Sequence, residues 1–174
     1  MRRALSTWRR SGVAVAAPIL ALGCATPLPI PFDENQARYA TQQGNNDVSG
    51  TATIGSKGGY TRTCQDVFLL PATAYWRAWA QEAFGNATYA PRLKIQQLAV
   101  DKRAWSLARH ADCDCAGHFH FSNVADGKYY VFSEIVWLLR WQQNGGGLLQ
   151  AVDVRNGAAL RVSLMQDWRA PPGD

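Results

Sequence analysis

The residues best suited to chemistry gather in one short stretch, HADCDCAGHFH, which spans residues 110–120. Seven of these eleven residues carry imidazole, thiol or carboxylate groups, which are ligands of metal ions such as zinc and copper. They are His110, Asp112, Cys113, Asp114, Cys115, His118 and His120. Side chains two residues apart on a strand share a face, so His118 and His120 could bind one ion together, with Cys115 as a further ligand. The spacing nevertheless fits no standard zinc motif.

The same alternation has a simpler interpretation. If residues 117–121 form a strand, the two Phe side chains face the core while His118 and His120 face solvent. We therefore expect a solvated strand face with no metal and no other cofactor. A zinc-binding, copper-binding or redox protein that uses residues 110–120 stays as the alternative function.

The remaining candidates for chemistry are weaker. No motif frames a nucleophile, so we expect no enzyme. Several Trp side chains could stack on sugar rings, but large aromatic residues at helical or alternating spacing usually belong to the core. Trp141 and Trp168, which lie near a turn and near the chain end, are expected to be the most exposed.

The N-terminus is typical of an export signal. Residues 1–10 carry four Arg and no acid, and residues 12–22 form an apolar run of eleven. A membrane span needs about 20 apolar residues, whereas the apolar part of a signal peptide needs about 7–15. We predict a signal peptide over residues 1–23 and export by the general secretory route, with twin-arginine export as the alternative that the Arg9-Arg10 pair leaves open.

The end of this leader, Leu20–Cys24, resembles a lipobox, the site at which a bacterial signal peptidase cuts before a lipid-modified Cys. Ala21 and Leu22 stand in the reverse of the usual order, and ordinary cleavage near Ala25 or an uncleaved anchor stay open as alternatives. The resemblance implies that Cys24 carries acyl chains, palmitate among them, which would hold the protein to a membrane. Ala25 after the Cys, rather than Asp, implies the outer membrane.

The basic charge of the chain belongs mostly to the leader. Four of the 18 Lys and Arg lie in it, so 14 remain against 13 Asp and Glu. A nucleic-acid-binding domain needs a basic patch on its folded surface, so we expect no nucleic-acid partner.

Residues 24–48 are expected to be the lipidated Cys and a flexible tether. Pro27, Pro29 and Pro31 favour an extended backbone, and the polar residues that follow are rich in turn formers. We place a single β-sandwich domain in residues 49–168.

Short apolar runs separated by turn signals predict this sandwich. The expected strands cover residues 49–54, 64–70, 117–121, 128–137, 148–154 and 159–164. The expected turns lie at Gly58-Gly59, Asp126-Gly127, Asn144–Gly147 and Asn156-Gly157, and the last of these joins a final hairpin.

One helix interrupts the strands. Thr73 is a favourable N-cap, Ala74–Phe84 is rich in helix formers, and Gly85 can end the helix in a left-handed conformation.

The pattern Gly117-x-Phe119-x-Phe121-x-x-Val124-x-x-Gly127-x-Tyr129-x-Val131 resembles the signature of carboxypeptidase regulatory-like domains. The segment from Gly58 to Tyr75 is similar to bacterial lipoproteins that carry such a domain. The resemblance implies a transthyretin-like β-sandwich of about seven strands, in which the strands on either side of Gly127 form one hairpin of the core. It implies no peptidase active site.

The same resemblance implies a disulfide between Cys64 and Cys113, because similar lipoproteins carry Cys at these two places. Cys115 is the competing partner. The resemblance also implies a non-catalytic binding or assembly module of the cell envelope, with a protein or a glycan as its partner.

Labelling with a radioactive fatty acid tests the anchor. We expect the bacterial host to attach label to the wild-type chain and not to the Cys24→Ser variant, because the lipid is carried by that thiol. Label that persists in the variant contradicts the assignment of Cys24.

Overall fold

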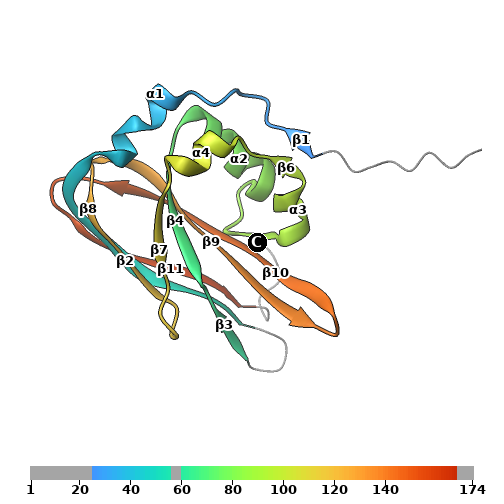
Figure 1. Cartoon of the computed structure of the whole chain (residues 1–174). Helices are drawn as coiled ribbons and strands as arrows, with labels where there is room; N and C mark the ends of the chain where they lie inside the picture. Colours follow the sequence, from blue (N-terminus) through green and yellow to red (C-terminus); the bar gives the residue numbers. More distant parts are fainter. Residues whose placement is uncertain (1–24, 56–59, 168–174) are drawn as a thin grey trace, which may run out of the picture.

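The computed structural model describes residues 25–55 and 60–167 (Figure 1). Within these ranges no helix is long and apolar enough to cross a lipid bilayer. The expectations about the signal peptide, Cys24, the turn at Gly58-Gly59 and Trp168 concern residues outside the described ranges.

The described residues form a mainly β structure, which confirms the expected β-sandwich class. The strands are β1 (Thr26–Pro27), β2 (Gln43–Gly55), β3 (Thr61–Thr63), β4 (Asp66–Pro71), β5 (Tyr89–Pro91), β6 (Leu98–Ala99), β7 (Arg109–Asp112), β8 (His118–Val124), β9 (Gly127–Leu139), β10 (Gln142–Val154) and β11 (Ala159–Asp167). The helices are α1 (Glu34–Ala37), η1 (Arg38–Thr41), α2 (Ala74–Phe84), α3 (Arg92–Gln96) and α4 (Lys102–Ser106). The expectation of about seven strands and one helix was therefore too low on both counts.

Two sheets pack face to face. The first has the order β5-β10-β9-β4-β7 and is antiparallel throughout. In the second, β2 pairs in parallel with β11 on one side and antiparallel with β8 and β3 on the other. Period-two alternation turns one face of each strand inward, so β4 contributes Val67 and Leu69 to the core while β8 contributes Phe119 and Phe121.

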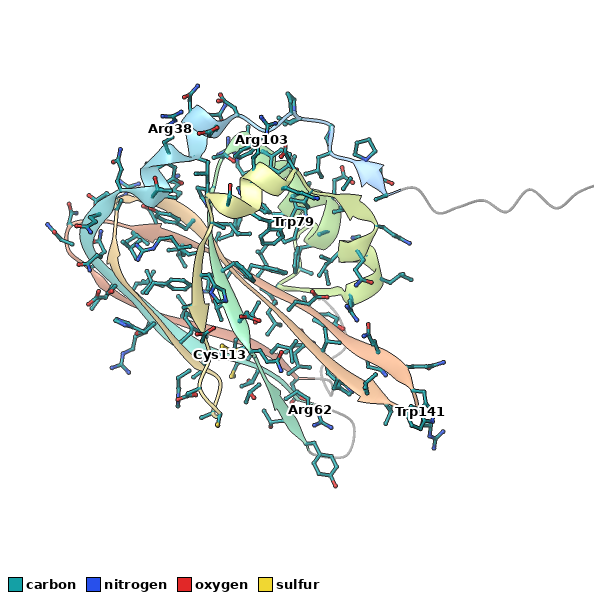
Figure 2. All side chains as sticks on the ribbon, in the orientation of Figure 1. Arg38, Arg62, Trp79, Arg103, Cys113 and Trp141 are labelled. Carbon is teal, nitrogen blue, oxygen red and sulfur yellow. A yellow bond between two sulfur atoms is a disulfide. The ribbon has the colours of Figure 1, made fainter. Side chains whose placement is uncertain are left out.

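The helices cover part of the outer face of the first sheet (Figure 1). The expected helix is confirmed as α2: the Thr73 hydroxyl accepts a hydrogen bond from the Trp76 N–H, and Gly85 ends the helix at φ +62°. Trp76 and Trp79 are fully buried and meet edge to face, with 5.3 Å between the ring centroids. Trp79 is labelled in Figure 2. Neither indole N–H has an acceptor among the described residues, so the apolar contact of these rings outweighs a cost of about 1–3 kcal/mol for each unmade hydrogen bond.

Residues 25–48 are part of the fold, which corrects the expectation of a flexible tether. They form β1, α1, η1 and the first part of β2, and Ala37, Ala40 and Val48 are buried. Asn46 is also buried, with its amide bonded to the Val124 carbonyl, the Asp126 carboxylate and the Ala158 N–H, each at 2.8 Å. A polar side chain buried with its hydrogen bonds satisfied resembles, in sequence alone, a polar residue of a loop.

Two expected hairpins are connections between the sheets instead. The segment at Asp126-Gly127 joins β8 to β9, and the turn at Asn156-Gly157 joins β10 to β11. In each case the two strands belong to different sheets, since β8 and β11 pair with β2. The inward aromatic residues on either side of Gly127 do meet in the core, but from opposite sheets rather than along one hairpin.

The expected turn at Asn144–Gly147 is wrong. These residues lie inside β10, and the chain reverses at Arg140-Trp141, between the paired residues Leu139 and Gln142. A Cβ on Gly146 would approach the Ala90 carbonyl to 2.3 Å, and one on Gly147 would approach Ile95 to 2.5 Å. The glycines therefore permit β5 and α3 to pack closely on β10.

Arg140 and Trp141 have φ values of +49° and +67°, the left-handed conformation that a type I′ turn requires and that bulky side chains disfavour. Replacing the pair with the preferred residues, Arg140→Asn/Trp141→Gly, should raise the free energy of unfolding by about 1–2 kcal/mol. Urea denaturation measures the change.

The turn at Asn156-Gly157 supplies the matched control, because it has the favoured residues at φ +60° and +71°. The reverse exchange there, Asn156→Arg/Gly157→Trp, should lower stability. A loss of stability in the Asn-Gly variant of the β9–β10 turn would show that the native side chains make folding contacts.

Candidate functional site

The helices leave one part of the outer face of the first sheet open, and polar residues occupy it. Asp112 of β7 lies directly opposite Asp66 of β4. The antiparallel register of β4 on β9 pairs Phe68 with Phe132. Two residues further toward the turn of β9, the same register places Glu134 next to Asp66. Three carboxylates from three neighbouring strands therefore form a row across the sheet.

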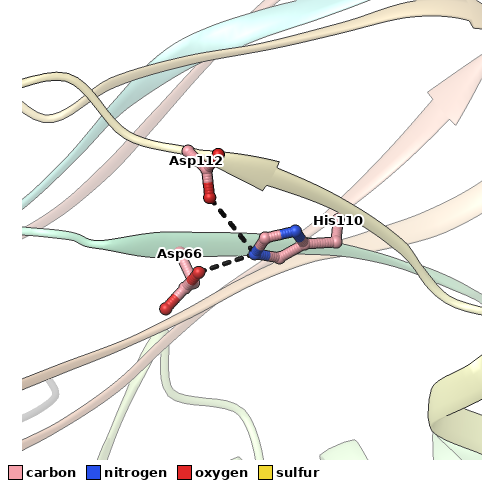
Figure 3. Close-up of side chains that lie close together, drawn as sticks. All are labelled: Asp66, His110 and Asp112. Carbon is pink, nitrogen blue, oxygen red and sulfur yellow. Dashed lines mark hydrogen bonds and ion pairs between the residues drawn. The ribbon is translucent and has the colours of Figure 1, made fainter.

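His110 binds two of these carboxylates (Figure 3). Its Nε2 lies 2.6 Å from an oxygen of Asp66 and 3.8 Å from an oxygen of Asp112. The ring also packs on Phe68, with 5.2 Å between the ring centroids. Because the Phe68 ring and the Asp112 carboxylate hold His110, the imidazole orients the Asp66 carboxylate at the surface.

A hollow of about 270 Å³ adjoins this cluster. It is lined by Thr63, Gln65, Asp66, Phe68, Glu134, Ile135 and Val136. At one side, Arg92 of α3 forms an ion pair of 3.0 Å with Glu134 and also contacts Gln143. The hollow thus combines hydrogen-bonding side chains with an apolar surface. The two carboxylates that line it, Asp66 and Glu134, outnumber the one guanidinium beside it.

The Cys64–Cys113 disulfide, which the family resemblance implied, is confirmed, with 5.8 Å between the two Cα atoms. Cys64 stands two residues before Asp66, and Cys113 directly follows Asp112. The bridge therefore fastens together the ends of β4 and β7 that carry the cluster. Cys115 has a free and exposed thiol.

The structure places His118 and His120 on the exposed face of β8, in the second sheet, with the two Phe side chains buried on the other face. His118 Nδ1 lies 2.9 Å from Asp114, and His120 Nε2 lies 3.9 Å from Asp47. Hydrogen bonds from the His118 N–H and the His118 ring hold the pKa of Asp114 below its usual range. Each of these two His side chains thus has a carboxylate partner of its own.

Among the described residues, Asp66, His110 and Asp112 are the group whose possible ligand atoms lie within 4.8 Å of one another. This group contains none of the predicted alternative ligands His118, His120 and Cys115. Sequence reasoning counted His110 and Asp112 as candidates but missed Asp66, which lies 44 residues before His110. No local signal could find it, because only the pairing of β4 with β7 brings it there.

A second hollow, of about 480 Å³, lies where the β8–β9 and β10–β11 connections meet the start of β2. It is lined by Gln42, Gln43, Gly44, Asn45, Ala125, Asp126, Asn156 and Gly157. The lining is mostly amide side chains and contains no aromatic ring, so it offers hydrogen bonds without a surface for stacking.

No protein-family model and no curated protein matches the chain. Among solved structures, it is similar to a candidate carbohydrate-binding protein of Pseudomonas aeruginosa, with a TM-score of 0.63 and 26% sequence identity. That likeness covers 78% of this chain and 97% of the Pseudomonas protein, so the two share their β-sandwich over nearly the whole of the latter.

Two pilin structures are more distant. A minor pilin of Streptococcus agalactiae has a TM-score of 0.37 and 16% identity, covering 76% of this chain and 48% of the pilin. The pilus 2b backbone protein of group B streptococcus has a TM-score of 0.35 and 14% identity, covering 71% of this chain and 40% of the pilin. Likenesses of this size carry no argument about function.

Removal of the disulfide tests its structural role. Cys64→Ala/Cys113→Ala should lower the free energy of unfolding by about 4 kcal/mol, because the bond closes a loop of roughly fifty residues in the unfolded chain. Cys115→Ser should leave stability unchanged. Thiol titration of the unfolded chain from Ala25 onward should find one thiol before reduction, and a count of three there contradicts the pairing.

Proposed function

We propose that this protein is an exported, lipid-anchored module of the bacterial envelope that binds a glycan without catalysing a reaction. The observation that carries the proposal is the likeness to the Pseudomonas protein, which is described as a candidate for carbohydrate binding and is covered over 97% of its length. The binding site we assign is the hollow beside Asp66 on the outer face of the first sheet.

The chemistry of this hollow suits a sugar. A sugar ring presents hydroxyl groups around its edge and C–H groups on its faces. The carboxylates of Asp66 and Glu134 can accept hydrogen bonds from hydroxyls, and such charge-assisted bonds are stronger than neutral ones. Phe68 and Val136 offer apolar surface to the C–H groups.

The charge of the site narrows the class of sugar. Of its three carboxylates, only Glu134 pairs with a guanidinium, that of Arg92, while Asp66 and Asp112 contact His110. An anionic sugar would meet net negative charge, so neutral sugars and amino sugars are the expected ligands.

The anchor we propose is lipid on Cys24, in the outer membrane. Because the fold begins within the first residues after Ala25, such an anchor would hold the domain close to the membrane surface. The glycan would then be one that lies within reach of that surface.

A calorimetric titration with neutral and anionic oligosaccharides, including oligomers of N-acetylglucosamine, tests the binding site. Asp66→Asn keeps the shape of the side chain but removes its charge, so we expect a loss of affinity of about tenfold for the neutral ligand that binds best. Gln43→Ala, in the second hollow, is the matched control and should bind as the wild type does.

Two results would overturn this assignment. Loss of binding in Gln43→Ala with normal binding in Asp66→Asn would move the site to the second hollow. Absence of binding to every oligosaccharide would contradict the proposed function itself.

A divalent cation at Asp66, His110 and Asp112 is the competing function, favoured by the convergence of their ligand atoms within 4.8 Å. To bind it, His110 Nε2 would have to give up its 2.6 Å contact with Asp66. The same titration with zinc separates the two functions. Stoichiometric zinc binding that is lost in His110→Ala and kept in His118→Ala would support cation binding at this group.

A further inference from the structure

The end of the β9–β10 ribbon extends beyond the rest of the sheet (Figures 1 and 2). β4 pairs with β9 from Tyr129 to Phe132 and no further toward the turn. β5 pairs with β10 only from Gly146 to Leu148. The residues nearest the turn therefore pair only with each other. We call residues 138–141, Leu-Leu-Arg-Trp, the ribbon tip.

The ribbon tip is apolar and exposed. Trp141 is 97% exposed, as its place near the turn led us to expect, and Leu138 and Leu139 are 68% and 58% exposed. The other Trp side chains that the structure describes are buried or half-buried. Exposed apolar side chains that are neighbours in this way are unfavourable in water and are typical of an interaction site.

The apolar side chains lie on both faces of the ribbon. Successive residues of a strand point to opposite faces, so Leu138 and Leu139 face opposite ways, and Trp141 occupies the end. A partner with a rigid surface would cover one face and leave the other in water. A lipid layer surrounds an inserted tip on all sides, so it can cover both faces at once.

The charge of the ribbon tip matches a lipid headgroup region. Arg140 is the only charged residue from Val136 to Gly147, and no ion-pair partner for it lies among the described residues. A guanidinium beside an indole ring suits the boundary between phosphate headgroups and acyl chains, where Trp and Arg side chains are favoured. No carboxylate in this stretch opposes approach to an anionic membrane.

The backbone of the ribbon limits how deep the ribbon tip can insert into a membrane. Beyond Phe132 and Gly146, the outer edges of the ribbon have no neighbouring strand in the described structure, and unpaired N–H and C=O groups are costly in hydrocarbon. Insertion is therefore confined to the interface. The left-handed φ values at Arg140 and Trp141 also show that these side chains are kept at a cost to the turn.

We infer that the ribbon tip inserts into the interface of an anionic lipid membrane and gives this protein a second, reversible membrane contact. It goes beyond the proposed function, because it requires neither the lipid on Cys24 nor the glycan site.

Vesicle binding tests the inference with the unlipidated chain that begins at Ala25. Every residue of the two buried clusters lies between Leu28 and Leu164, so this chain contains the whole core. The probes are vesicles of phosphatidylethanolamine and phosphatidylglycerol, and vesicles of phosphatidylcholine alone. We expect co-sedimentation with the anionic vesicles, weaker binding to the neutral ones, and quenching of Trp fluorescence by brominated lipid.

The turn exchange Arg140→Asn/Trp141→Gly should reduce the vesicle partition coefficient by about tenfold or more, because it removes both the indole and the charge. Since the same exchange is expected to stabilise the fold, unfolding cannot explain a loss of binding. Leu138→Ser should also weaken binding, whereas Leu93→Ser on α3, at the same 68% exposure, should not.

Several results would overturn the inference. They are wild-type protein that stays in the supernatant, equal binding by the turn-exchange variant, or equal losses in Leu138→Ser and Leu93→Ser. Self-association that the turn exchange abolishes, in the absence of vesicle binding, would assign the ribbon tip to a second copy of the chain instead.

Discussion

The rest of the structure depends on the burial of the five-stranded sheet on both of its faces. Its central strand β9 alternates Tyr129 and Val131, which face the second sheet, with Phe132, which faces the helices. Each face needs a cover of its own, because an exposed apolar face would be unstable in water. The second sheet covers one face except at the ribbon tip, and the short helices cover only part of the other. The uncovered part is where polar side chains can meet a ligand.

The connections of the sandwich follow from the same requirement. A chain that builds two sheets must cross between them, and it does so where β8 leads into β9 and where β10 leads into β11. Asn46 fastens both crossings at one end of the sandwich by bonding to Val124, Asp126 and Ala158. The Cys64–Cys113 bridge fastens β4 to β7. The candidate glycan site lies beside the bridge, on strands whose ends are held in place.

The candidate glycan site and the ribbon tip each expose an excess of one kind of surface that the described residues do not balance. At the glycan site the excess is charge, since three carboxylates share one His and one Arg. At the ribbon tip the excess is apolar area around Trp141. A protein held near a membrane by its N-terminus could use both, one toward a sugar and the other toward lipid. If lipid on Cys24 anchors the chain as proposed, the absence of a long tether within the described residues would keep the domain close to the membrane.

The sequence by itself determined what local interactions control. Thr73, the run Ala74–Phe84 and Gly85 define α2, because capping and helix propensity act within one turn of the chain. The alternation of His and Phe in residues 118–121 likewise determined which face of β8 is buried. The family resemblance further identified the pair of cysteines that forms the disulfide.

Only the tertiary structure decided which strands pair and therefore which side chains meet. Asp66 joins His110 because β4 lies beside β7, and no spacing in the sequence encodes that neighbourhood. Residues 144–147 resemble a turn in the sequence. In the structure, α3 and β5 occupy the space that side chains at Gly146 and Gly147 would need. Asn46 resembles a tether residue until its three partners surround it. In each case the deciding contact is with a residue far away along the chain, so no local sequence pattern reflects its energy.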